Sequence, residues 1–126
     1  MDAFKWLEDT DEVFDVIVVD FPDPTNFNIG KLYTMSFYAL LEKRLAASGY
    51  AVVQTTSPLV ARKSFWTVVT TIEAAGLRTT RYLTAASLPL LFNFPADMAR
   101  LPAEVNRLSN QALVHTYEAE WGRVHE

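Results

Sequence analysis

The chain contains 126 residues, of which 50% are hydrophobic and 21% are charged, as in one small globular domain. This composition excludes a disordered chain, because it supplies enough apolar surface for a core. The 15 acidic and 11 basic residues give a formal net charge of −4, so nucleic acid is not an expected partner. The absence of cysteine excludes disulfides, thiolate catalysis and zinc–sulfur sites.

No apolar run reaches the roughly 18 residues that a membrane-spanning helix requires. The opening residues, MDAFKWLEDTDE, also lack the basic segment and apolar stretch of a signal peptide. We therefore expect a cytoplasmic protein, with no membrane segment in this chain.

The first half of the chain predicts helices and strands in alternation. A short helical pattern covers residues 2–8, and Asp2 could cap it. The apolar, β-branched run at 14–20 predicts a strand buried on both faces. The next expected elements are a loop, a helix that Ser48-Gly49 would end, and a second strand, over residues 21–30, 31–47 and 50–56.

The second half begins in the same way and then changes. A buried stripe of Phe65, Val68, Val69 and Ile72 predicts a helix that stops near Gly76. Residues 77–83 predict a weaker, more exposed third strand. Beyond them we expect an apolar stretch at 88–94 and a long helix over about 103–121, with no strand and no visible chemistry.

Alternation of this kind predicts an α/β fold with right-handed crossovers on a partial parallel sheet, Rossmann-like, with flanking helices and a C-terminal helical tail. Three strands are few, so the chain has the organisation of half of a doubly wound domain. We expect that half to cover residues 1–84 and the tail to cover 85–126. Ligands in such sheets bind at the carboxyl ends of the strands.

Two acids, Asp20 and Asp23, follow the first predicted strand in the sequence DFPDP. Carboxylates three residues apart in a loop can converge on one cationic ligand, and one of them can take a proton from an ammonium group. In the structural alternative, Asp20 caps the following turn and Asp23 forms an Asp-Pro turn.

Further polar residues are candidates for the same edge of the sheet. Asp2 lies 18 residues before Asp20, which would place it at the end of a preceding strand, and its alternative role is a helix cap. Gln54 ends the second strand and is either a polar contact there or a satisfied buried amide. His115 and His125 have no second histidine at i+4, so no metal site is predicted.

The motif DFPDP, followed by DPTNF and GKLY, resembles the acid-x-x-acid-proline loop of the polyamine aminopropyltransferases, the spermidine synthases. The segment TSPLVARKSFW and the tail are similar to the longer bacterial members, so the resemblance covers nearly all of the chain. It implies a Rossmann-like, methyltransferase-type fold. It also implies transfer of an aminopropyl group from decarboxylated S-adenosylmethionine to putrescine or a related polyamine.

The resemblance also implies a role for each matching residue. Asp20 corresponds to the acid that accepts the proton of the attacking amine, and Asp23 to its partner in holding the polyamine. Asp2, with the backbone of Ala3, corresponds to the site that reads the adenine of the co-substrate. Phe27 stands where many members have a proline against the nucleoside. No resident cofactor and no metal are implied.

The chain also departs from the family pattern. It lacks the family's glycine-rich first half, and it is shortened after the third predicted strand. We therefore expect an incomplete enzyme that is inactive by itself and forms a homo-oligomer through its open sheet. The alternatives are a non-catalytic remnant that acts as a self-associating or binding module, and a methyltransferase-like domain, against which the missing glycine-rich loop argues.

Overall fold

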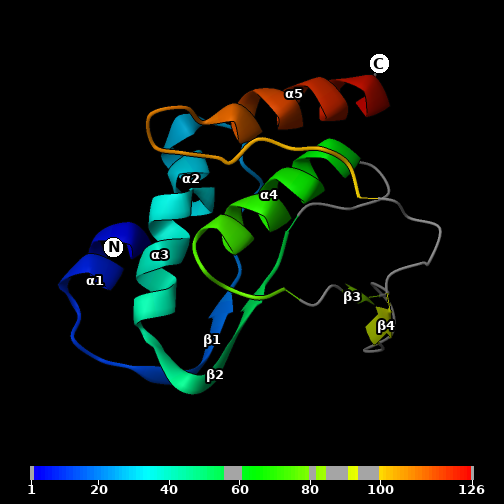
Figure 1. Cartoon of the computed structure of the whole chain (residues 1–126). Helices are drawn as coiled ribbons and strands as arrows, with labels where there is room; N and C mark the ends of the chain where they lie inside the picture. The colour runs from blue at the N-terminus through cyan, green and yellow to red at the C-terminus, as the bar shows by residue number, and fades with distance from the viewer. Residues whose placement is uncertain (1, 56–60, 80–81, 85–90, 94–99, 126) are drawn as a thin grey trace.

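The computed structural model describes residues 2–55, 61–79, 82–84, 91–93 and 100–125 (Figure 1). Helices and strands alternate through the first part of the chain. In chain order the elements are α1 (Ala3–Asp9), β1 (Phe14–Val19), α2 (Phe27–Gly30), the 3-10 helix η1 (Lys31–Tyr33), α3 (Met35–Lys43), β2 (Leu45–Val53), α4 (Arg62–Ala74), β3 (Tyr82–Thr84), β4 (Leu91–Asn93) and α5 (Ala112–His125).

Strands β1 and β2 pair in parallel, which confirms the predicted arrangement of the two apolar runs. Val16 lies opposite Tyr50, and Val19 lies opposite Val53. The register shifts near Gly49, where an added Cβ would lie 2.9 Å from the carbonyl oxygen of Asp15. Gly49 therefore permits a close approach inside the sheet, and the prediction that it ends a helix was wrong.

One face of this sheet carries the core. Its side chains Ile17, Val19, Ala51 and Val53 pack with buried residues of α1, α3 and α4. The buried members of this cluster are Leu7, Val19, Tyr33, Phe37, Tyr38, Leu41, Val68 and Leu113. Helices α3 and α4 thus contribute to the same core.

The opposite face of the sheet is open. Val16, Val18, Tyr50 and Val52 are 56%, 70%, 71% and 58% exposed, although all four are large apolar side chains. They form two directly opposed pairs on neighbouring strands. Among the described residues, nothing covers this face, so the prediction that the first strand is buried on both faces was wrong.

The helix predicted over 31–47 is interrupted once, at Thr34, and ends early. It begins as η1 and restarts at α3, where the Thr34 hydroxyl accepts a hydrogen bond from the Phe37 N–H at 3.3 Å. It ends at Lys43, because the next residues join the sheet: the Phe14 N–H donates to the Arg44 carbonyl at 2.7 Å. Pairing with β1 therefore overrides the helix propensity of Leu45, Ala46 and Ala47.

The third strand predicted over 77–83 overlaps β3 only at Tyr82 and Leu83, residues 80–81 lie outside the described residues, and the predicted partner was wrong. Leu77 packs against the main core, and residues 77–79 form no strand. Strand β3 is antiparallel to β4 in a second sheet, whereas a third member of the parallel sheet was expected. Antiparallel neighbours separated by a short connection can pair locally, without a crossover.

The tail also differs from the prediction, since it contains β4 and its helix begins at Ala112. The preceding residues turn around the buried side chain of Asn106, which donates to the Tyr33 carbonyl at 3.1 Å and accepts from the Leu113 N–H at 3.2 Å. Helix α5 then packs on α4 and α2 (Figure 1).

The α/β class, with a small parallel sheet and flanking helices, is as expected and is consistent with a Rossmann-like methyltransferase-type fold. In the part of the chain that the structure describes, no helix is both long and apolar enough to cross a bilayer.

Candidate functional site

The acid loop, residues 20–24, leaves the sheet at the carboxyl end of β1. Asp20 directly follows Val19, the last residue of that strand. The Gln54 N–H donates to the Val19 carbonyl at 2.9 Å, so Gln54 lies at the same edge. Asp20, Asp23 and Gln54 are all exposed. The structure therefore places these predicted site residues at the expected end of the sheet, accessible to a ligand.

Tyr33, a buried residue of η1, holds the backbone of this loop. Its hydroxyl donates to the carbonyl of Pro22 at 2.8 Å and lies 3.3 Å from that of Phe21. These two carbonyls lie between the two acids. Pro24 is also buried, so the loop is anchored on both sides of Asp23.

A second tyrosine reaches the loop from α5. The Tyr117 hydroxyl donates to Asp23 Oδ2 at 2.8 Å, and Tyr117 is only 3% exposed. The two residues are 94 positions apart in sequence. The tail, in which no chemistry was expected, thus contributes a side chain to the acid loop.

Both tyrosines remain protonated at neutral pH. Burial, followed by the charges of Asp23 and Asp20, raises the pKa of Tyr33 to about 12. Burial and the hydrogen bond to Asp23 raise the pKa of Tyr117 as well. Each phenol is therefore a hydrogen-bond donor to the acid loop at neutral pH.

Asp2 is the N-cap of α1, as one of the two alternatives predicted. Its Oδ1 accepts from the Phe4 N–H at 3.0 Å, and its Oδ2 forms an ion pair with Lys31 Nζ at 2.5 Å. The hydrogen bond to Lys31 lowers the pKa of Asp2 below its usual value. Ala3 is the first residue of the capped helix.

Phe27 opens α2, which Asn26 caps by accepting from the Ile29 N–H at 3.0 Å. Phe27 is 55% exposed, and its ring centroid lies 5.7 Å from that of His115 in an edge-to-face arrangement. Phe27 and His115 form a partly open aromatic pair between α2 and α5. Such a pair could contact a flat ligand ring.

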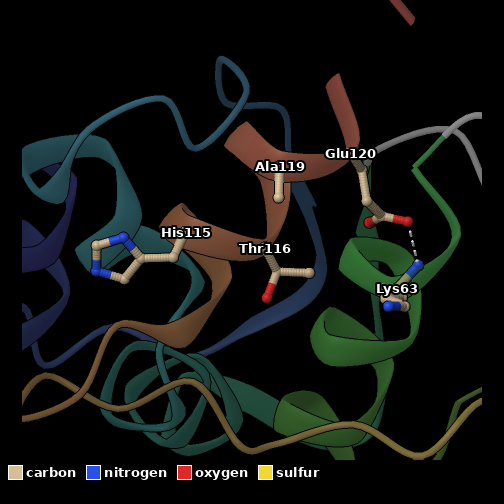
Figure 2. A pocket seen from close by; sticks show the side chains of 5 residues that line it. All are labelled: Lys63, His115, Thr116, Ala119 and Glu120. Atoms are coloured by element: carbon tan, nitrogen blue, oxygen red, sulfur yellow. Dashed lines mark hydrogen bonds between the residues drawn. The ribbon is translucent and has the colours of Figure 1, made fainter. Parts of the chain in front are cut away.

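An open pocket of about 260 Å³ lies between α4 and α5. Figure 2 shows its lining, with Lys63 on α4 and His115, Thr116, Ala119 and Glu120 on α5. The Glu120 carboxylate already accepts from the Lys63 and Ser64 N–H groups at 2.8 and 2.6 Å. The Glu120 carboxylate therefore occupies the place at the start of α4 where an anionic ligand could bind. The pocket contains none of the predicted site residues.

In the described part of the chain, no three histidine, cysteine, aspartate or glutamate side chains gather in a way that could hold a metal ion.

Sequence reasoning missed Tyr33, Tyr117 and Asn106. Tyr33 lies inside the motif GKLY, and Tyr117 lies on the apolar stripe of the tail. Their phenolic groups could have been a signal, since a buried tyrosine hydroxyl usually needs a partner. Which partner it finds depends on tertiary packing.

A parallel sheet with an acid loop at its carboxyl edge defines an α/β domain of the Rossmann-like type. The profile of the spermine/spermidine synthase domain matches residues 1–93, so the chain belongs to this family. No solved structure shows significant similarity to the chain.

Curated relatives support the assignment. The chain is 38% identical over 155 aligned positions to the polyamine aminopropyltransferase of Leptospira interrogans, with 98% of this chain and 31% of the relative covered. It is also 38% identical to polyamine aminopropyltransferase 2 of Ralstonia nicotianae (95% and 30% covered) and 43% identical to polyamine aminopropyltransferase 1 of Streptomyces coelicolor (64% and 15% covered).

The chain therefore spans about a third of the length of the Leptospira and Ralstonia relatives. The Leptospira alignment is longer than the chain itself, so that relative has residues within the aligned region that this chain lacks. This agrees with the internal shortening expected from the sequence.

Proposed function

We propose that this chain carries the amine-binding, proton-accepting part of an aminopropyltransferase active site. The observation that supports the proposal is the acid loop, in which two exposed carboxylates at a strand end flank a backbone held by a buried tyrosine. Carboxylates bind the ammonium groups of putrescine or a related polyamine through charge. The relatives that match nearly the whole chain are named polyamine aminopropyltransferases.

In the proposed reaction, Asp20 accepts a proton from one ammonium group of putrescine, which frees the nitrogen lone pair. That nitrogen attacks the aminopropyl carbon bonded to the sulfonium of decarboxylated S-adenosylmethionine. A new C–N bond forms, the C–S bond breaks, and the sulfur keeps the electron pair in methylthioadenosine. Asp23 and Gln54 hold the amine, and no resident cofactor takes part.

Asp2, with Ala3 and Phe27, would hold the co-substrate's nucleoside. Since Asp2 Oδ2 already binds Lys31, an adenine amino group would share this carboxylate with the lysine. The isolated chain would bind the nucleoside more weakly than a complete enzyme, because the family's glycine-rich half is not part of it.

Two measurements test the proposal. Putrescine added to the labelled chain should shift the side-chain signals of Asp20 and Asp23, and salt should weaken the binding. Asp11→Asn serves as a matched control, because Asp11 is exposed and lies outside the acid loop. Binding that persists unchanged in Asp20→Asn and Asp23→Asn variants would overturn the proposal.

The second measurement concerns catalysis. In a complete enzyme that carries this segment, Asp20→Asn should lower aminopropyl transfer by about 100-fold or more, as expected for loss of a general base. The isolated chain should show no transfer. Full activity of the Asp20→Asn enzyme would remove Asp20 from the role of base, and turnover by the chain alone would contradict its inactivity.

The second candidate function is a self-associating module, and the open face of the sheet favours it. Val16, Val18, Tyr50 and Val52 present four apolar side chains with no charge among them. Exposed apolar patches of this kind are typical of association sites. A sedimentation coefficient that rises with protein concentration would support this function.

A further inference from the structure

Helix α5 contacts the acid loop through Tyr117. The Tyr117 hydroxyl donates a hydrogen bond to one carboxylate oxygen of Asp23, Oδ2, at 2.8 Å. Among the described residues, the other oxygen, Oδ1, accepts no hydrogen bond from the protein. One side of the carboxylate is therefore fixed, and the other is left for a ligand.

The position of Tyr117 is itself determined by contacts on both sides of it along α5. Val114, one turn earlier, packs against Gly30, where an added Cβ would lie only 2.7 Å from Val114 Cγ2. Glu120, one turn later, is 7% exposed and binds the first N–H groups of α4. The helix cannot shift without breaking these contacts, so the phenol has little freedom to move.

The protonation state of Tyr117 also favours its hydrogen bond to Asp23. Burial and Asp23 together raise the pKa of Tyr117, so its hydroxyl keeps its proton well above neutral pH. A phenol donating to a carboxylate forms a charge-assisted hydrogen bond, which is stronger and more directional than a neutral one. Tyr33 holds the backbone of the loop, and Tyr117 holds one of its carboxylates.

We propose that Tyr117 is a positioning residue for amine binding: it orients Asp23 so that Oδ1 meets an ammonium group, and it makes α5 part of the polyamine site. This inference rests on the proposed function of the acid loop. Fixing a side chain in its bound orientation lowers the entropy cost of binding, so the contribution of Tyr117 should appear in ligand affinity.

The test is a double-mutant cycle on the whole chain, with putrescine affinity measured by titration calorimetry. Tyr117→Phe should weaken binding by roughly tenfold, the effect of one charge-assisted hydrogen bond on orientation. In the Asp23→Asn background, the same substitution should have almost no further effect, because Tyr117 acts through Asp23. Tyr50→Phe, on the open sheet face, is the matched control and should bind like wild type.

The outcomes separate this inference from the proposed function. If wild type binds putrescine through Asp23 and Tyr117→Phe binds equally well, only the role of Tyr117 is overturned. If Tyr117→Phe weakens binding equally with and without Asp23, its effect is general destabilisation and the positioning role is wrong. If wild type does not bind putrescine at all, both proposals fail.

A second readout needs no variant, in case Tyr117→Phe does not fold. With ¹³C-labelled tyrosine rings in the wild-type chain, putrescine should move the Tyr117 Cζ signal with the same midpoint as the Asp23 carboxylate signal. The Tyr50 signal should stay in place. A Tyr117 signal that does not respond while Asp23 does would contradict the inference.

Discussion

At the scale of single residues, the acid loop is held by hydrogen bonds from tyrosine hydroxyls to a carboxylate and to backbone carbonyls. Tyr33 and Tyr117 are both buried, and both direct their hydroxyls at the acid loop. The loop has no regular secondary structure, so these side chains supply hydrogen bonds that a helix or strand would otherwise provide.

The raised pKa of Tyr33 predicts a specific loss of stability in alkali. An unfolded tyrosine ionises near pH 10, whereas Tyr33 in the fold ionises at about 12. Its contribution is complete below pH 10 and is lost as the pH rises to 12, because the unfolded chain releases its proton first. Urea unfolding at a series of pH values should show the free energy of unfolding falling over this range.

Tyr33→Phe should reduce the loss of unfolding free energy between pH 10 and 12. Part of the loss will remain, because the pKa values of Tyr38 and Tyr117 are also raised. Tyr50→Phe is the control. An equally steep fall in Tyr33→Phe would show that Tyr33 does not contribute.

The ion pair between Asp2 and Lys31 makes a second prediction at this scale. The pKa of Asp2 is low chiefly because of its hydrogen bond to Lys31. Lys31→Met should therefore raise the Asp2 pKa toward the usual aspartate value, measured by the pH titration of its side-chain NMR signal. Lys5→Met, which breaks an exposed pair with Asp9, should leave the Asp2 titration nearly unchanged. An equal response to both variants would contradict a specific pairing.

At the scale of elements, a side chain of α5 caps the N-terminus of α4. The N-cap residue of α4, Ala61, has no side-chain oxygen, and Glu120 of α5 takes over the capping function. Its carboxylate accepts from two backbone N–H groups and from the Ser64 hydroxyl at 2.8 Å. The two helices are thus joined by buried polar contacts as well as by packing.

Glu120→Ala should lower the free energy of unfolding by about 2 kcal/mol or more, because it leaves the first N–H groups of α4 and a buried hydroxyl without a partner. Denaturant unfolding measures this loss. Glu118→Ala is the matched control, since Glu118 is exposed on the same helix, and it should change stability by less than about 0.5 kcal/mol. Equal effects of the two substitutions would exclude the capping role.

At the scale of the whole molecule, a two-stranded parallel sheet covered on one face is the dominant feature. Sheets of this kind in α/β proteins normally have both faces covered. Here, within the described residues, each of these strands pairs on one side only and one apolar face is open. Both features favour association.

We predict that two copies of the chain associate through this face. A specific interface buries about 800 Å² on each partner, more than four side chains supply, so the free strand edges must also take part and binding should be weak. Val18→Asp should lower the association constant at least tenfold, because it places a charge in the apolar patch. Sedimentation at increasing concentration measures the change, and Asp11→Asn is the control.

A wild-type chain that remains monomeric at high micromolar concentration would contradict this prediction. A Val18→Asp chain that still associates would place the interface elsewhere.

How much could be predicted from the sequence differs between the sheet and the site. Runs of β-branched residues separated by helical stripes were enough to predict that β1 and β2 exist and pair in parallel, although not the open face of the sheet or the start of β2 at Leu45. The motif DFPDP was enough to locate the acid loop at a strand end. The division of the chain at residue 84 stays a prediction.

The end of α3 at Lys43 and the pairing of β3 with β4 could not be predicted in this way. Leu45, Ala46 and Ala47 favour a helix locally, and pairing with β1, which includes the hydrogen bond from Phe14 to Arg44, draws this segment into the sheet. Secondary-structure propensity is weak compared with a pairing that becomes available only after the chain folds.

The sequence by itself determined the class of fold, the order of the central elements and the family to which the chain belongs. Only the tertiary structure decided that Tyr117 reaches Asp23, that Glu120 caps α4 and that one sheet face stays open. The physical reason is the distance along the sequence over which each signal acts. A hydrophobic period or a short motif reports on a few neighbouring residues. The Tyr117–Asp23 and Glu120–Ser64 contacts join positions 94 and 56 residues apart, and side-chain identity alone does not specify such contacts.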